Sequence, residues 1–249
     1  MLNSKSNLNT RKLGERLSTD KTIQWLEIVI VFLPVVLVIV MFRLSGTNNP
    51  MLFIGAIWIT NIVMLSLIWL GIKLRGDSLD SIGLSFKKAS ISNIVWTFLK
   101  SIPIFVFAAI AFIFVPIVMA SIVGVQSGAD MTKYNYMQGN LPMLLFSLSG
   151  VYIVSSMGEE VVYRGFLITR LQTLFGGEGK IAVFSALILS SMIFGLAHFE
   201  WGLTGIVQTA FMGAAFGIAF LLTKRRLWPL ILAHAYMDTL LFVQLYLAP

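Results

Sequence analysis

Long uninterrupted apolar runs constrain the fold of this 249-residue chain more than any other feature of its sequence. Most of these runs approach the roughly 20 residues that a helix needs to cross the hydrocarbon core of a bilayer. They do not alternate between apolar and polar residues, as the strands of a membrane barrel do. Hydrophobic residues make up 57% of the chain and charged residues 12%, which excludes an ordinary soluble domain.

We therefore predict an all-α fold, a polytopic transmembrane helical bundle of about seven spans. One run is too long for a simple span, and we expect an interfacial segment up to Ser101 followed by a span from Ile102. Pro103 and Pro116 leave a re-entrant hairpin open as an alternative. The predicted runs cover residues 23–42, 51–72, 94–125, 141–157, 181–199, 205–222 and 228–247.

The formal net charge of +7 is concentrated in short segments between the apolar runs. Most Lys and Arg residues lie in the N-terminal segment 1–22 and in every second link after it, which predicts a cytoplasmic N-terminus. We expect an integral protein of the plasma membrane whose partners include membrane lipid, and we do not expect nucleic-acid binding. The absence of cysteine excludes disulfides, thiolate zinc sites and a cysteine nucleophile.

Ionisable residues inside the predicted spans mark the candidate site, because burying a charge in a bilayer is costly. Both histidines of the chain, His198 and His234, fall inside spans, as does Asp238. Glu159 and Glu160 lie at the end of another span. Two histidines and three carboxylates on three spans predict one shared site.

Spacing along these helices indicates which side chains meet. Residues four apart share a helix face, so Arg164 can pair with Glu160 and leave Glu159 free to face the bundle. The same spacing lets Phe194 pack under the ring of His198. It also lets Asp238, in the motif His234-x-x-x-Asp238, hydrogen-bond to His234 and fix the tautomer of that ring.

The expected depth of the site in the membrane indicates how the fourth and fifth spans are connected. Glu159 and His198 are nearly equidistant from the glycine-rich turn at 176–179, which places them at similar height in an antiparallel hairpin. A straight helix would put both about 28 Å from that turn, whereas His234 follows a basic turn closely. We therefore expect an interfacial helical hairpin near residues 161–180, extending beyond the bilayer or lying on its cytoplasmic surface, with Arg164 and Arg170 outside the hydrocarbon.

Three motifs in order, Glu159-Glu160-x-x-x-Arg164, Phe194-x-x-x-His198 and His234-x-x-x-Asp238, resemble those of the CAAX protease and bacteriocin-processing (CPBP, or Abi) family. The resemblance covers roughly residues 141–245. It divides the chain into a cytoplasmic basic N-terminus (1–22), N-terminal transmembrane helices and loops (23–140) and a CPBP-like catalytic core (141–249).

The resemblance implies a metal-independent, glutamate-dependent intramembrane endopeptidase. Glu159 would be the general base that activates a water with help from His198, and His234 and Asp238 would stabilise the oxyanion. Glu160 and Arg164 would support the site, with Phe194 packing beneath it. The implied substrate is a membrane-associated, hydrophobic or lipidated peptide or protein tail, reached from a site that opens toward the cytoplasmic side.

Several alternatives stay open. An ionised aspartate cannot donate a hydrogen bond, so Asp238 must be protonated or act by holding His234 as the donor, and we favour the second. Two histidines with carboxylates can hold zinc, although the chain has no H-E-x-x-H motif. A non-proteolytic membrane binding or bacteriocin-immunity protein on the same fold is the main competing function, and a transporter or channel is less favoured because repeat symmetry is absent. The sequence leaves the oligomeric state and the identity of the substrate open.

Overall fold

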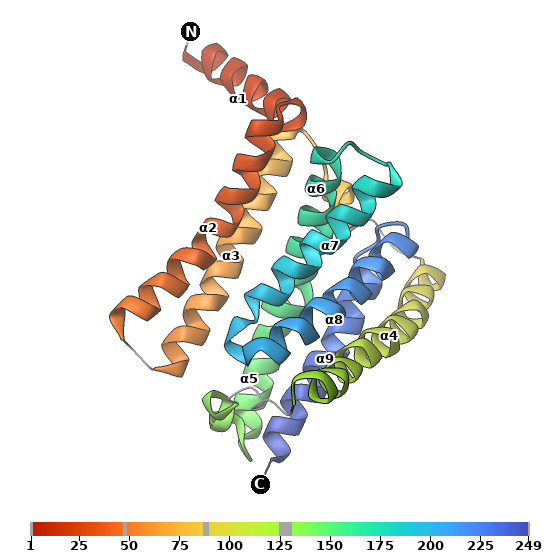
Figure 1. Ribbon diagram of the computed structural model, residues 1–249. Coiled ribbons are helices and arrows are strands. Elements are labelled where there is room, and N and C mark those ends of the chain that lie inside the picture. Colours follow the sequence, from red (N-terminus) through yellow and green to blue (C-terminus); the bar gives the residue numbers. More distant parts are fainter. Residues whose placement is uncertain (1, 47–48, 87–89, 125–130, 249) are drawn as a thin grey trace.

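The computed structural model describes residues 2–46, 49–86, 90–124 and 131–248. Within these ranges it contains seven helices that are long and apolar enough to cross a membrane (Figure 1). The prediction of an all-α polytopic bundle is confirmed, and the protein is an integral membrane protein. The spans are α2 (Lys21–Ser45), α3 (Pro50–Arg75), α4 (Ile91–Val123), the joined helices α5 (Leu141–Val151), η3 (Tyr152–Ile168) and α6 (Thr169–Leu174), then α7 (Lys180–Ala197), α8 (Gly202–Leu222) and α9 (Trp228–Leu247).

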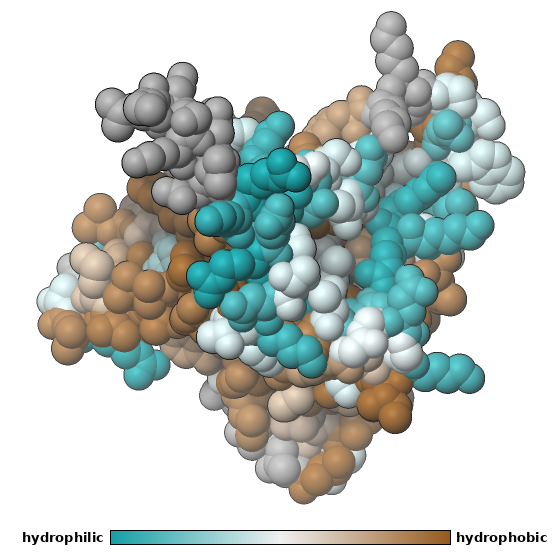
Figure 2. All heavy atoms as spheres, turned by 90° about the horizontal axis from the view of Figure 1, so that it is seen from above, coloured by the Kyte–Doolittle hydropathy of each residue, from teal (hydrophilic) through white to brown (hydrophobic). Residues whose placement is uncertain are grey.

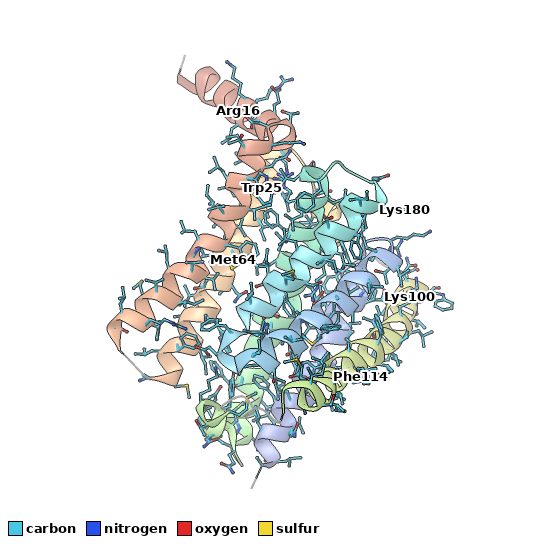
Figure 3. All side chains as sticks on the ribbon, viewed as in Figure 1. Arg16, Trp25, Met64, Lys100, Phe114 and Lys180 are labelled. Atoms are coloured by element: carbon cyan, nitrogen blue, oxygen red, sulfur yellow. The ribbon has the colours of Figure 1, made fainter. Side chains whose placement is uncertain are left out.

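The surface of the bundle has the character that a lipid environment requires. Large apolar side chains on its flanks are exposed, among them Phe114 on α4 and Ile181 on α7, which are 61% and 83% exposed. Figure 3 shows Phe114 directed away from the neighbouring helices. Seen from the end that carries the N-terminus, hydrophilic residues gather in the middle and hydrophobic ones at the rim (Figure 2). Such a belt of exposed apolar side chains is stable against lipid, not against water.

The basic N-terminal segment forms a helix of its own, α1 (Leu2–Thr19). Asp20 separates α1 from α2: its carboxylate caps α2 by accepting hydrogen bonds from the backbone N–H groups of Thr22 and Ile23. These backbone hydrogen bonds, chiefly the one from Ile23, lower the pKa of the Asp20 carboxyl, and the Arg16 guanidinium adds to the effect.

Helix α4 is continuous over 33 residues, including Pro103 and Pro116. The re-entrant hairpin is therefore not formed, and the segment before Ser101 belongs to the same helix. Pro116 has no N–H, so the carbonyl of Phe112 lacks its helical donor. The side-chain amide of Gln208 on α8 fills this position, with Nε2 donating to the Phe112 oxygen at 2.8 Å.

The fourth span is also longer than its apolar run suggested. The chain continues as one helical rod from Leu141 to Leu174, and its middle part, η3, is a π-helix. The hydrogen bonds of a π-helix run from residue i to i+5, and such segments are frequent at functional sites. The 100° per residue of an α-helix therefore does not apply here, although side chains four apart still meet.

The expected hairpin near 161–180 is formed by η3, α6, the turn at 175–179 and the start of α7. Its interfacial position, with Arg164 and Arg170 outside the hydrocarbon, stays a prediction, and the structure adds that both arginines are buried in protein. Arg164 and Arg170 are 1% and 8% exposed, because protein side chains rather than headgroups or water surround them. Each is neutralised by a buried carboxylate, Arg164 by Glu160 and Arg170 by Glu27.

A buried cluster of charges joins the N-terminal helices to this rod. Glu27 on α2 accepts hydrogen bonds from Arg75 on α3 and from Arg170 on α6. Arg170 also donates to the backbone oxygen of Leu17 on α1, at 3.1 Å, and Arg75 pairs with Asp77 at 2.9 Å. The cluster connects α1, α2, α3 and α6 at the end of the bundle where α1 lies.

Helices α7 and α8 approach each other closely along two glycines of α8. A Cβ atom on Gly213 would lie 2.9 Å from the ring of Phe194, and one on Gly217 would lie 2.3 Å from Leu187. Small residues at this spacing allow close helix contact in membranes. The approach brings α8 against the helix that carries His198.

The links that the charge pattern grouped together do lie at one end of the bundle. Figure 1 shows α1, the turn at 175–179 and the turn before α9 at one end, with the last turn of α2, the first turn of α3 and the end of α9 at the other. Arg16 and Lys180 both lie toward the first end (Figure 3). Which end faces the cytoplasm stays a prediction.

Candidate active site

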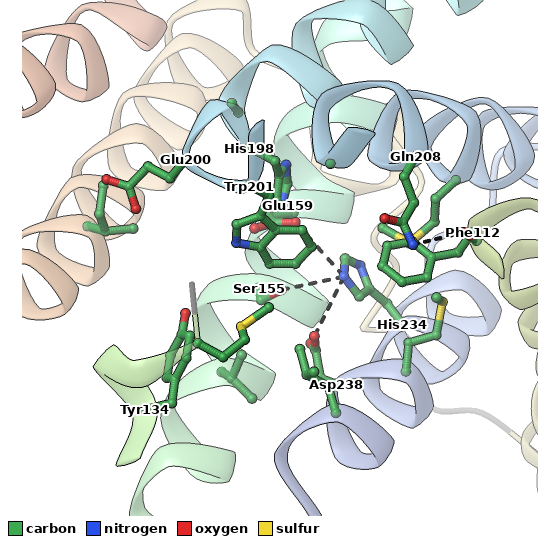
Figure 4. Close-up of a pocket in the computed structure, with 18 of the residues that line it drawn as sticks. Phe112, Tyr134, Ser155, Glu159, His198, Glu200, Trp201, Gln208, His234 and Asp238 are labelled. Carbon is green, nitrogen blue, oxygen red and sulfur yellow. Dashed lines mark hydrogen bonds and ion pairs between the residues drawn. The ribbon is translucent and has the colours of Figure 1, made fainter. Parts of the chain in front are cut away.

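A cavity of about 790 Å³ lies among the membrane helices, and most of the residues that line it are apolar. Four predicted catalytic residues, Glu159, His198, His234 and Asp238, are among its lining residues (Figure 4). They come from η3, the end of α7 and α9. Residues of the three motifs, up to 79 positions apart in the sequence, therefore line the same cavity.

Among the residues that line the cavity, Glu159 carries the carboxylate that is best placed to act as a base. Its side chain is 19% exposed, and its Oε2 atom is buried without a hydrogen-bond partner among the described residues. This oxygen lies 3.9 Å from Nε2 of His234. A carboxylate oxygen that is shielded from bulk solvent and still has a free lone pair is suited to accept a proton from a bound water.

Glu160 points the other way, into the protein. Its side chain is completely buried, and its Oε1 atom accepts hydrogen bonds from Nη1 of Arg164 and Nδ1 of His234, each at 2.9 Å. The predicted pairing of Glu160 with Arg164 is confirmed. Because a buried charge needs a partner, this ion pair lets the carboxylate remain charged behind the cavity wall.

The guanidinium of Arg164 is in contact with side chains and backbone of several helices. Its guanidinium lies over the rings of Phe194 and Phe216, 4.4 and 5.2 Å from their centroids, and its Nη2 donates to the carbonyl of Gly213 at 3.3 Å. Arg164 thereby ties the rod to α7 and α8. Its contacts fix the position of Glu160.

The ring of His234 is fixed by Glu160, not by Asp238. The expected hydrogen bond between Asp238 and His234 is absent: Oδ1 of Asp238 lies 3.9 Å from Nε2 of His234. The carboxylate of Asp238 instead accepts a hydrogen bond from the hydroxyl of Ser156, at 2.7 Å. In an α-helical register Asp238 could reach His234, but the hydroxyl on η3 offers a shorter contact. The Nδ1–H of His234 is used by Glu160, so Nε2 is the atom that faces the cavity.

His198 caps the end of α7, where the helix gives way to η4 (Phe199–Trp201). Its Nδ1 lies 2.9 Å from the carbonyl oxygen of Phe194, which can only accept, so Nδ1 carries the hydrogen and Nε2 is free. The ring packs against Phe194 and Trp201, with centroids 4.9 and 5.1 Å apart. The expected packing of Phe194 under His198 is confirmed.

Sequence reasoning missed two serines of this site. Ser155 lines the cavity, with its Oγ 3.4 Å from Nε2 of His234, and Ser156 is fully buried beside Asp238. The only signal available was their place one turn before the Glu159–Glu160 pair. Serine is common in membrane helices, so this signal is weak.

A salt bridge lies at the outer part of the cavity wall. Lys133 on η2 (Thr132–Met137) pairs with Glu200 on η4 at 2.7 Å, and its ammonium also lies over the rings of Phe53 and Tyr134. Burial raises the pKa of the Tyr134 phenol to about 12, so this ring stays neutral at physiological pH.

The cavity extends from the middle of the bundle toward one of its ends. Among the described residues, no lining side chain comes from α1 or from the turns at 175–179 and 223–227. The lining includes residues of η2 and η4. The side of the membrane toward which the site opens stays a prediction, as does the side of the N-terminus.

Sequence comparisons agree with the resemblance carried by the three motifs. Residues 141–240 match the family described as Type II CAAX prenyl endopeptidase Rce1-like. The chain is also similar to the membrane-embedded CAAX protease MroQ of Staphylococcus aureus (strain USA300), with 30% identity over 119 residues. That alignment covers 47% of this chain and 46% of the relative, so the chain spans about half the length of the relative it matches. No solved structure matches the chain significantly. The predicted resemblance to the CAAX protease family is thus confirmed.

Proposed function

On the basis of this family resemblance, we propose that the protein is an intramembrane endopeptidase that hydrolyses a peptide bond with a water activated by Glu159. One observation carries the proposal. The unpartnered Oε2 atom of Glu159 lies in a cavity that it shares with His198 and His234. This arrangement provides a proton acceptor next to two imidazoles, which is the minimum that general-base hydrolysis of an amide needs.

The proposed reaction assigns a task to each side chain. Glu159, assisted by the free Nε2 of His198, takes a proton from water as its oxygen attacks the substrate carbonyl. Nε2–H of His234, in the imidazolium form of the ring, stabilises the oxyanion of the tetrahedral intermediate. The proton held by Glu159 then passes to the departing amine as the C–N bond breaks. Glu160 holds His234 in position, and Arg164 holds Glu160.

We propose that this reaction needs no metal. In support, the described residues contain no group of three His, Asp or Glu side chains arranged to hold a metal ion. A chelator test below decides between this mechanism and zinc.

The proposed substrate is a hydrophobic or lipidated peptide or protein tail associated with the membrane. The apolar lining of the cavity suits such a chain, and the names of the matching family and relative refer to CAAX substrates. The proposed setting is the plasma membrane, with lipid as the surrounding partner. We place the α1 end on the cytoplasmic side because its basic residues favour it, and we propose that substrates reach the site from that side.

The test is cleavage by purified full-length protein in lipid vesicles, with peptides extracted from membranes of its own cell and products read by mass spectrometry. Glu159→Gln and a chelator control run in parallel. New peptide termini that require Glu159 and persist with the chelator support the proposal. Activity lost with the chelator alone indicates a zinc enzyme. No Glu159-dependent product from folded protein indicates a binding or immunity protein instead.

A further inference from the structure

We propose that Ser155 is a further catalytic residue, whose hydroxyl donates a hydrogen bond to the oxyanion formed during peptide hydrolysis. This inference rests on the proposed function and deepens it. It starts from the position of Ser155 in η3, four residues before Glu159, where both side chains line the cavity (Figure 4). The serine thus lies next to the carboxylate that is proposed to activate the water.

The hydroxyl of Ser155 faces two groups of the cavity. Its Oγ lies 3.4 Å from Nε2 of His234, longer than a normal hydrogen bond of a hydroxyl group, and the carboxylate of Asp238 is a second acceptor for it. Other serines of the membrane helices are engaged at short distance: Ser149 donates to the carbonyl of Phe146 at 2.7 Å, and Ser156 donates to Asp238 at 2.7 Å. Ser155 can exchange its acceptor Asp238 for a substrate oxygen by rotating its O–H, because a hydroxyl hydrogen turns about the C–O bond and Asp238 keeps the hydrogen bond from Ser156.

The carboxylates around His234 make a hydrogen-bond donor for the oxyanion necessary. Carboxylate oxygens of Glu159, Glu160 and Asp238 lie 3.9, 2.9 and 3.9 Å from ring nitrogens of His234. They oppose a negative charge that develops on a substrate oxygen nearby. Stabilising the oxyanion therefore requires donors aimed directly at it.

His234 can provide one donor and Asp238 can provide none. The Nδ1–H of His234 is directed at Glu160, which leaves Nε2 as the ring nitrogen facing the cavity, and Nε2 donates when the ring is the imidazolium form paired with Glu160. An ionised Asp238 can only accept, and it already accepts from Ser156. The hydroxyl that neighbours Nε2 of His234 is that of Ser155, so these two groups together form a pair of donors for one oxyanion.

The step is balanced without another reactant. Glu159 takes one proton from water, the water oxygen bonds to the substrate carbon, and the carbonyl oxygen becomes the oxyanion. Ser155 and His234 donate hydrogen bonds to that oxygen without losing a proton. When the C–N bond breaks, the carbonyl re-forms and the amine takes the proton from Glu159.

The test measures kcat and KM with a fluorophore- and quencher-labelled form of the membrane peptide whose cleavage depends on Glu159. Ser155→Ala should lower kcat by about 100- to 1,000-fold with little change in KM, because the hydrogen bond is made only in the transition state. Ser155→Thr keeps the hydroxyl and should retain most of the activity. Ser149→Ala on the same rod should match the wild type, since Ser149 is exposed and bonds only to its own helix.

A second background separates a donor from a structural residue. Asp238→Asn places an amide donor beside the same oxygen, so Ser155→Ala should cost less kcat in the Asp238→Asn protein than in the wild type. Equal kcat of Ser155→Ala and wild type would overturn the inference while leaving the proposed function intact. Equal losses in both backgrounds, or an acyl ester trapped on Ser155, would also overturn it. Absence of any Glu159-dependent cleavage would overturn the proposed function and this inference together.

Discussion

Nδ1 of His234 lies 2.9 Å from Oε1 of Glu160, so the histidine of α9 is oriented by a carboxylate of another helix and not by Asp238 on its own. The same Glu160 oxygen accepts from Arg164 at 2.9 Å. A completely buried carboxylate thus receives two donors on one oxygen. This relationship makes Glu160 the residue through which Arg164 acts on the cavity.

Glu160→Gln should therefore lower both stability and kcat. The amide removes the negative charge, so Arg164 becomes an unpaired buried cation, which costs about 3–5 kcal/mol. Thermal unfolding in detergent and cleavage kinetics measure the two effects. The double variant Glu160→Gln with Arg164→Met removes both charges and should recover stability but not kcat, because His234 remains without its orienting carboxylate. Full activity of either variant would contradict the assigned role of Glu160.

Glu27→Gln should destabilise the protein without touching the cavity. Glu27 is buried between Arg75 and Arg170, and its loss leaves two buried guanidinium groups without their common partner. We expect a loss of about 3–5 kcal/mol in the free energy of unfolding, seen as a lower midpoint of thermal unfolding. Glu15→Gln is the matched control, because its pair with Arg11 is exposed and worth little. Similar midpoints for the two variants would show that the cluster is not stabilising.

Gln208 and Pro116 should show coupled effects on stability. Gln208→Leu leaves the carbonyl of Phe112 without a donor in the bundle, which costs about 1–3 kcal/mol. Pro116→Ala restores the backbone N–H that can bond to the same carbonyl. The cost of Gln208→Leu should therefore shrink in the Pro116→Ala background. Additive effects in a double-mutant cycle would rule out this compensation.

The absence of cysteine permits a direct test of topology. Glu178, in the turn before α7, and Asn135, in η2, are both exposed and lie at opposite ends of the bundle. Single variants Glu178→Cys and Asn135→Cys should react with a membrane-impermeant maleimide from opposite sides, Glu178→Cys from the cytoplasm. Labelling of both from one side would contradict the arrangement of the helices. Labelling of Asn135→Cys from the cytoplasm alone would invert the orientation.

The sequence predicted the class of fold and the members of the site well, for definite physical reasons. Long apolar runs predict membrane spans because only apolar side chains are stable against lipid. The few charged residues inside those runs predict a functional site because burying a charge in the membrane is costly. Glu159, His198, His234 and Asp238 all line the cavity for this reason. The hydrogen-bond partners of these residues were harder to predict than their place in the cavity.

One wrong expectation shows what helix periodicity cannot predict. The expectation that Asp238 fixes His234 relied on spacing within one helix, whereas the contact that forms is between helices. The pairing of Arg170 with Glu27, more than 140 positions away in sequence, was likewise not predicted. Periodicity describes one helix at a time and carries no information about distant partners. The π-helix was invisible as well, because the pattern of apolar residues does not distinguish i+4 from i+5 hydrogen bonding.

The buried cluster around Glu27 bears on how this protein can be divided. The family match begins at residue 141, yet Arg170 within it depends on a carboxylate from α2 and on the Leu17 carbonyl from α1. The cavity wall likewise takes side chains from α2, α3 and α4. The matched segment is therefore not an autonomous module: expressed by itself, it would lose both the counterion of Arg170 and the part of the cavity wall that α2, α3 and α4 supply.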